Sequence, residues 1–229
     1  MKKITIALDG FSSTGKSTIA KRLAKELGYI YVDTGAMYRA VTLFSMRNGY
    51  VSDEKTEVNA IVKTLPYIRL KFVFNENLGF AEMYLNDENV EHEIRTIEVS
   101  NQVSKVAQIP EVRQKLVDIQ KEMGKNKGIV MDGRDIGTVV FPDAELKLFL
   151  TASPETRANR RYKELVDKGE KVSYAEVLKN VQDRDLMDST REISPLKQAE
   201  DAIEFDNSDM GLEEQFERIY NFALRKIKP

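Results

Sequence analysis

The sequence predicts an α/β fold, with a five-stranded parallel sheet flanked by helices and a small antiparallel β insert. Short apolar runs alternate with longer stretches of helical periodicity, which is typical of parallel strands joined by crossover helices. One glycine-rich turn connects the first apolar run to the first helix, and β-rich runs linked by turns interrupt the alternation near the middle. Because 229 residues can bury a sizeable core, we expect a single domain spanning residues 1–229.

The first part of the chain alternates strand and helix. Strands are expected over 4–8 and 29–32, and helices over 16–27, 35–48 and 52–65. Gly28 suits a left-handed cap on the first helix, Gly49 ends the second, and Pro66 ends the third.

The middle of the chain changes to a β-rich texture. Residues 67–74 and 80–85 contain strand-forming residues with a turn between them, and a third short run ends at Val90. We therefore expect an antiparallel insert over about residues 66–92. Helical spacing returns over 94–107, and Pro110 begins a helix that runs to about Met123.

The last part returns to alternating strands and helices. Strands are expected over 128–131, 146–150 and 202–206. A helix begins at Ser153-Pro154, a capping-box pattern from Ser173 to Glu176 opens another, and an amphipathic helix over 212–227 closes the chain.

The composition excludes several classes of protein. Hydrophobic residues make up 41% and charged residues 31%, as in soluble globular proteins, and no run approaches the roughly 18 apolar residues of a membrane span. The absence of cysteine excludes disulfides, thiolate metal sites and cysteine nucleophiles, and we expect a cytoplasmic location. The net charge of −2 argues against a nucleic-acid partner, since such proteins carry a basic surplus. His92, the only histidine, is expected to be a surface or turn residue without a role.

Residues 10–17, Gly-Phe-Ser-Ser-Thr-Gly-Lys-Ser, have the spacing of a phosphate-binding loop. The glycines let the backbone N–H groups wrap a phosphate, and the helix behind adds a partial positive charge. Lys16 reaches the terminal phosphates of a nucleoside triphosphate, and the Ser17 hydroxyl can bind Mg²⁺. The strand before and the helix after favour this interpretation over an ordinary glycine-rich turn. We expect a nucleoside triphosphate and Mg²⁺ at this loop, with the phosphates held by Gly10, Phe11, Ser12, Ser13, Thr14, Gly15, Lys16, Ser17 and Thr18.

Asp132 is the candidate metal carboxylate. It directly follows an apolar strand, where phosphate-loop enzymes place the acidic residue that holds the metal or its water. A turn aspartate that caps nearby N–H groups is the alternative. We assign the metal site to Ser17 and Asp132.

Arginines are the remaining catalytic candidates. Arg157, Arg160 and Arg161 are spaced i, i+3 and i+4, so one helix face presents three guanidinium groups. Arg134 lies beside the candidate metal carboxylate at a strand edge. Phosphoryl transfer needs fixed cations around the phosphoryl group that moves. Because the same chain has a phosphate loop, a catalytic role for these arginines is favoured over a solvated basic helix face. The predicted catalytic residues are Lys16, Arg134, Arg157, Arg160 and Arg161.

Three segments carry a resemblance to a known family. They are Asp33-Thr-Gly-Ala-Met-Tyr-Arg39, Glu93-Ile-Arg-Thr96, and Asp-Gly-Arg-Asp-Ile-Gly-Thr-Val-Val-Phe-Pro-Asp-Ala at 132–144. With them, the chain resembles the bacterial cytidylate kinase family over essentially its whole length. The resemblance implies a phosphate-loop nucleoside-monophosphate kinase fold, with a core, an acceptor-binding region that bears the insert and a helical lid over about residues 155–172. It implies transfer of the γ-phosphoryl group of Mg·ATP to CMP or dCMP, giving CDP or dCDP plus ADP. We expect a monomer, because the lid and the insert must move freely.

The resemblance also implies an acceptor site. Thr34 and Asp188 would face the sugar with Arg184 beside them, Arg39 and Arg134 would hold the α-phosphate, and the cytosine or its phosphate would be surrounded by Ser104, Arg113, Asp135 and Arg191. The arginines at 157, 160 and 161 match lid arginines that close over the triphosphate. Many relatives have proline in place of Phe11, and Gly-Thr in place of Ser17-Thr18, so the hydroxyl that contacts Mg²⁺ stays open.

This function has two alternatives. A GTPase switch needs Asn-Lys-x-Asp, but Asn126-Lys127-Gly128 is followed by Ile129, and no aspartate has a glycine three residues later. A phosphate-loop kinase for UMP, AMP or shikimate is the nearer alternative. The residues alone do not separate it from a CMP kinase, and the resemblance favours CMP.

Overall fold

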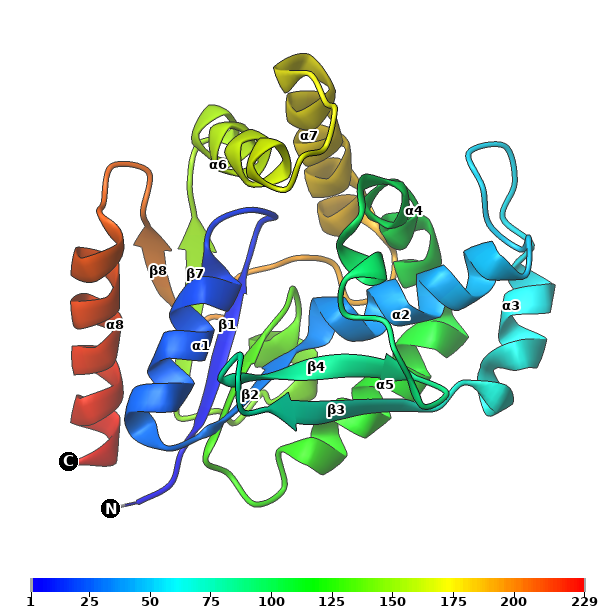
Figure 1. Cartoon of the computed structure of the whole chain (residues 1–229). Helices are drawn as coiled ribbons and strands as arrows, with labels where there is room; N and C mark the ends of the chain where they lie inside the picture. Colours follow the sequence, from blue (N-terminus) through cyan, green and yellow to red (C-terminus); the bar gives the residue numbers. More distant parts are fainter. Residues whose placement is uncertain (1, 229) are drawn as a thin grey trace. The chain divides into compact units, whose positions relative to one another are not determined.

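The computed structural model describes residues 2–228 (Figure 1). The chain forms two compact units. The first comprises the described residues of Met1–Ile30 and Asn126–Pro229, and the second is Tyr31–Lys125.

A five-stranded sheet has the order β2-β6-β1-β7-β8, which confirms the predicted fold class. Its strands are β1 (Thr5–Gly10), β2 (Ile30–Asp33), β6 (Ile129–Asp132), β7 (Leu146–Thr151) and β8 (Ile203–Asp206). Within the first unit, β1 runs parallel to both neighbours, with Leu8 opposite Asp132 on β6 and Leu148 on β7. The three inner strands β1, β6 and β7 are buried, and most of their residues are apolar. The residues that follow β1, β6 and β7 therefore lie at one edge, where α/β sheets bind ligands.

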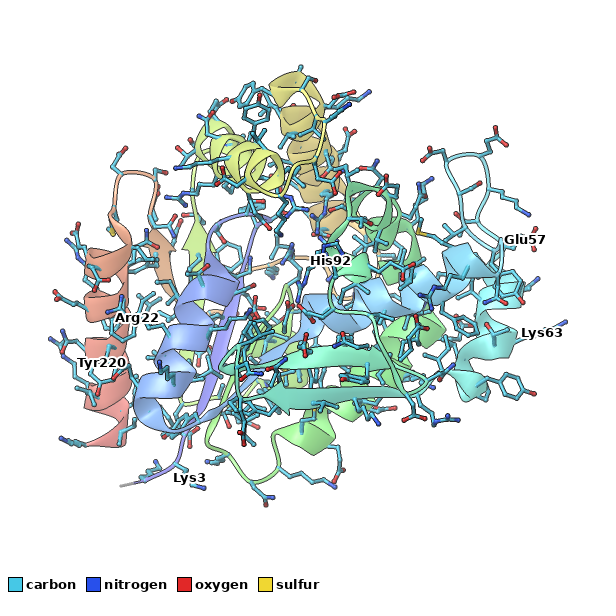
Figure 2. All side chains as sticks on the ribbon, in the orientation of Figure 1. Lys3, Arg22, Glu57, Lys63, His92 and Tyr220 are labelled. Carbon is cyan, nitrogen blue, oxygen red and sulfur yellow. The ribbon has the colours of Figure 1, made fainter. Side chains whose placement is uncertain are left out.

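Among its described residues, the first unit has four α-helices: α1 (Lys16–Leu27), α6 (Pro154–Asp167), α7 (Tyr174–Thr190) and α8 (Leu212–Ile227). The predicted caps are present, since Gly28 is left-handed at φ 66° and Ser173 forms the capping box with Glu176. In Figure 1, α8 lies beside α1 and α6 lies beside α7. Arg22 of α1 pairs with Glu213 at 2.6 Å and covers the Phe216 ring at 3.8 Å, which joins the two helices (Figure 2).

The second unit has its own apolar core. Its elements are α2 (Thr34–Arg47), α3 (Val58–Thr64), α4 (Ile97–Ala107), α5 (Pro110–Met123) and an antiparallel sheet of β3 (Leu70–Asn75), β4 (Phe80–Leu85) and β5 (Glu88–Asn89). Met37, Met83 and Leu116 are completely buried in that core. The small antiparallel insert is therefore confirmed, and it is anchored by the apolar side chains of β4.

The helix predicted over 52–65 is wrong in its first half. Val51 pairs with Thr56 in an antiparallel bridge, and the Ser52 N–H donates to the Lys55 carbonyl at 2.9 Å. Lys105 of α4 donates to the Ser52 carbonyl at 2.9 Å. These contacts satisfy the backbone outside a helix, so α3 begins only at Val58 and is followed by the 3₁₀ turn η1 (Leu65–Tyr67).

Two smaller differences concern turns. The helix predicted over 94–107 is divided into the 3₁₀ turn η2 (Glu93–Arg95) and α4, because Thr96 has an extended backbone with ψ 161°. A short π-helical turn, η3 (Ile136–Val140), follows β6 and was not predicted. Among the described residues, none of the helices combines the length and the apolar character that a membrane span requires.

Candidate active site

The phosphate loop connects β1 to α1, and its backbone conformation depends on two glycines. Gly10 has φ 141°, and a Cβ atom there would lie 2.0 Å from the Leu150 carbonyl oxygen on β7. Gly15 has φ 86° at the start of α1. Any side chain at Gly10 would displace the neighbouring strand, so these glycines are required by the conformation as well as by the pattern.

Lys16 is buried at the base of this loop. Its Nζ donates to the Phe11 carbonyl at 2.5 Å and to the Thr14 hydroxyl at 3.2 Å. Burial, followed by the charge of Arg134, lowers the pKa of Lys16 well below its usual value. The carboxylates of Asp132 and Asp9 oppose that shift. A buried ammonium of this kind is poorly solvated, so it interacts strongly with an anion that reaches it.

Ser17 and Asp132 meet although they are 115 residues apart in the sequence. The Ser17 hydroxyl donates to Asp132 Oδ2 at 2.8 Å, and Asp132 is buried at the end of β6. Thr18 is exposed on the next position of α1. Within residues 2–228 no three acidic or histidine side chains form a metal cluster. Two adjacent oxygen donors fit an ion such as Mg²⁺, which takes few protein ligands and completes its shell with phosphates and water.

Asp9 was missed by the sequence analysis. Its carboxylate is buried and accepts the N–H groups of Ile136 at 2.8 Å and Gly137 at 2.7 Å. Burial raises the pKa of Asp9 to about 6 in spite of these two hydrogen bonds. The contact ties the end of β1 to the segment that follows Asp132. Its place at the carboxyl end of a strand was the signal that could have found it.

The three arginines of α6 have different partners. Arg157 is buried and donates to the carbonyls of Ser12 at 3.2 Å and Ala152 at 2.9 Å. It also pairs with Asp185 of α7 at 2.7 Å, and its guanidinium lies 5.1 Å from the Phe11 ring centre. At position 11, many relatives were expected to have proline. The Phe11 ring of this chain lies beneath the Arg157 guanidinium.

The other two α6 arginines point elsewhere. Arg160 donates to Asn207 Oδ1 at 2.9 Å and to the Asn207 carbonyl at 2.8 Å. Arg161 pairs with Glu164 of its own helix at 2.8 Å. The hydrogen-bond and ion-pair partners named for the three guanidinium groups therefore differ.

Five of the predicted acceptor residues belong to the first unit: Arg134, Asp135, Arg184, Asp188 and Arg191. Arg134 Nε donates to Asp188 Oδ2 at 2.9 Å. Arg191 lies 3.7 Å from Asp188 Oδ1 and 3.9 Å from Asp135 Oδ1. All but Arg134 and Arg184 are buried. The structure thus brings alternating charges together along α7 and the segment after β6.

This charge cluster shifts two pKa values. Burial opposes ionisation of Asp188, but Arg134, Arg184 and Arg191 outweigh it and lower the pKa of that carboxyl. Burial and the charge of Arg134 lower the pKa of Arg184 to about 10. The Arg184 Nε is buried without a hydrogen-bond partner among the described residues, which leaves it a donor for a ligand.

The other four predicted acceptor residues belong to the second unit: Thr34, Arg39, Ser104 and Arg113. All four are buried. Arg39 donates to the Ile94 carbonyl and to the Ser100 hydroxyl, both at 3.1 Å. Arg113 donates to the Ala107 carbonyl at 3.1 Å, and its guanidinium lies 5.4 Å from the Tyr38 ring centre.

Arg95, from the Glu-Ile-Arg-Thr segment, was not predicted as a residue that supports the candidate acceptor site. It pairs with Asp33 at 2.7 Å, and Asp33 caps α2 by accepting the Ala36 N–H at 3.0 Å. It also pairs with Glu91 at 2.8 Å. Thr34, the first residue of α2, therefore directly follows a residue that a partly buried ion pair fixes. His92 is exposed just before η2, as predicted (Figure 2).

Comparison with known proteins decides the family. The cytidylate kinase family model matches residues 6–225. The chain belongs to the cytidylate kinase family. It is 66% identical over 228 residues to the cytidylate kinase of Flavobacterium johnsoniae, covering 100% of this chain and 99% of that protein. It is 65% identical to the cytidylate kinase of Flavobacterium psychrophilum (97% and 99% covered) and 57% identical to that of Phocaeicola vulgatus (94% and 94%). The predicted membership of the cytidylate kinase family is confirmed, and the function of this family is phosphoryl transfer to CMP.

Proposed function

We propose that this chain transfers the γ-phosphoryl group of ATP to CMP or dCMP, giving ADP plus CDP or dCDP. The observation that carries the proposal is the phosphate loop with buried Lys16 and the Ser17–Asp132 hydrogen bond, in a chain of the cytidylate kinase family. Membership supports a phosphotransferase acting on CMP with ATP as the donor.

ATP binds, in this proposal, with its phosphates against the loop N–H groups and Lys16. Mg²⁺, when bound, neutralises charge on the phosphates. Ser17 and Asp132 would hold it, because their oxygens are adjacent whereas Thr18 is exposed. The ammonium of Lys16 stabilises the charge that moves on to the leaving phosphate oxygens.

CMP binds, in this proposal, through the nine predicted acceptor residues. Arg39 and Arg134 hold its α-phosphate, and Thr34, Arg184 and Asp188 contact its sugar; the remaining contacts, to the base or the phosphate, come from Ser104, Arg113, Asp135 and Arg191. Support comes from the burial of seven of these residues, all but Arg134 and Arg184, and from the hydrogen bonds that fix Arg39 and Arg134, because preorganised charges need no rearrangement when the anion arrives.

We propose that α6 and the residues after it form the lid, over about residues 155–172, and that the whole chain works as one kinase domain. Arg157, Arg160 and Arg161 would complete the cationic surroundings of the transferring phosphoryl group on closure. The expected monomeric state and cytoplasmic location stay predictions.

A kinase assay tests the proposal. The purified protein should convert ATP and CMP to ADP and CDP only when a divalent metal is present. UMP, AMP and shikimate are tested as acceptors in parallel, and a faster reaction with one of them would replace CMP in the proposal.

Lys16→Met should lower the single-turnover rate by roughly 10²–10³, because it removes one fixed cation from the transition state. Lys25→Met is the matched control, since Lys25 is exposed on the same helix. A Lys16→Met rate within threefold of the parent would contradict the role given to Lys16.

A further inference from the structure

Asn207 is a completely buried residue that follows β8 and that the proposed mechanism leaves without a role. Its Nδ2 donates to the Thr14 carbonyl of the phosphate loop at 2.7 Å and to Gln215 Oε1 of α8 at 2.9 Å. Its Oδ1 accepts from Arg160 of α6 at 2.9 Å. One side chain thus joins the phosphate loop, the candidate lid helix and α8.

The orientation of the Asn207 amide follows from its partners. The guanidinium of Arg160 can only donate, so the amide oxygen must face it. The Thr14 carbonyl can only accept, so the amide nitrogen must face that side. An aspartate at this position could serve Arg160 but not Thr14, so asparagine is specifically suited to this place.

The contact with Thr14 sets the direction of one peptide plane. In a trans peptide the carbonyl and the following N–H point in opposite directions. Holding the Thr14 carbonyl toward Asn207 therefore directs the Gly15 N–H the other way. In phosphate loops such N–H groups point at the phosphates. Gly15 has φ 86°, and glycine adopts positive and negative φ about equally readily, so the residue itself does little to fix this peptide plane.

We propose that Asn207 is a positioning residue for the triphosphate donor, holding the Thr14–Gly15 peptide in its phosphate-binding orientation and tying Arg160 to the same point. This inference rests on the proposed function in that the donor is ATP. Asn207 itself does not touch the nucleotide in this proposal.

Calorimetric titration of ATP and, separately, of CMP tests the proposal on three variants. Asn207→Asp keeps an acceptor for Arg160 and removes the donor to Thr14. Asn207→Leu is neutral and of similar size, so it separates the lost hydrogen bond from the added charge. Asn221→Asp, at an exposed position of α8, makes the same change of charge away from the loop and serves as the control.

Both Asn207 variants should raise the Kd for ATP about 10- to 100-fold, the size expected when one hydrogen bond to a charged group is lost. The Kd for CMP should stay within twofold of the parent, and Asn221→Asp should match the parent for both ligands. If Asn207→Asp does not fold, as judged by circular dichroism, Asn207→Leu decides by the same criteria.

Two results would overturn the proposal. One is a folded Asn207 variant that binds ATP within threefold of the parent. The other is an equal loss of ATP and CMP affinity, which would indicate a general structural role. Failure of the proposed function would be seen separately, in the kinase assay. If the parent binds ATP but does not phosphorylate CMP, the effect of the Asn207 variants on ATP affinity can still be measured.

Discussion

Discrimination between cytosine and uracil should depend on Asp135. Cytosine presents an amine donor beside a ring acceptor, whereas uracil presents a carbonyl acceptor beside an N–H donor. A pocket with Asp135 as acceptor and Arg191 as donor suits cytosine and opposes uracil. We expect Asp135→Asn to relax this preference, because an amide can rotate and donate to the uracil carbonyl.

The magnitude follows from burial. The side chains of Asp135 and Arg191 are 6% and 4% exposed, so water cannot compensate for a mismatched partner. Each unsatisfied buried group costs about 1–3 kcal/mol, and two mismatches correspond to roughly 10²–10⁴ in kcat/KM.

The assay compares kcat/KM for CMP and UMP in the parent, in Asp135→Asn and in Asp143→Asn, an exposed control with the same change of charge. The parent should prefer CMP by the factor above, and Asp135→Asn should reduce the ratio by at least tenfold. Equal use of both acceptors by the parent would refute the pocket assignment. A lower CMP activity in Asp135→Asn with an unchanged ratio would instead make Asp135 a structural residue.

Other predictions concern the lid and the buried carboxylate. Arg157→Ala and Arg161→Ala should lower kcat while leaving the Kd for CMP nearly unchanged, because lid cations act after closure; a large loss of CMP affinity in calorimetry would move them to the acceptor site. Asp9 has a pKa of about 6 in the folded protein and 3.8 as a free side chain. Between these two pH values the folded state binds more protons than the unfolded state. The parent's free energy of unfolding therefore falls as the pH rises through this range, by up to about 3 kcal/mol. Asp9→Asn lacks this titration, so its free energy of unfolding in urea minus that of the parent should increase between pH 4 and 7. A difference that does not change with pH would contradict the raised pKa.

The sequence alone determined the local features of this protein. The alternation of apolar runs and helical stretches predicts the five-stranded sheet, and Gly10, Gly15 and Lys16 mark the phosphate loop, because these depend on residues close together in the chain. The motif blocks at 33–39, 93–96 and 132–144 are local in the same sense, and they are sufficient to indicate the cytidylate kinase family.

Only the tertiary structure decided which distant side chains meet. The Ser17–Asp132 contact exists because β6 lies directly beside β1, and strand order is not encoded in any local pattern. The same reason explains why Asp9 and Asn207 were missed, since their partners lie 127 and 193 residues away. The helix predicted over 52–65 failed for a related reason: contacts from α4 stabilise an alternative backbone at Ser52, and such contacts outweigh the weak helical preference of a short segment.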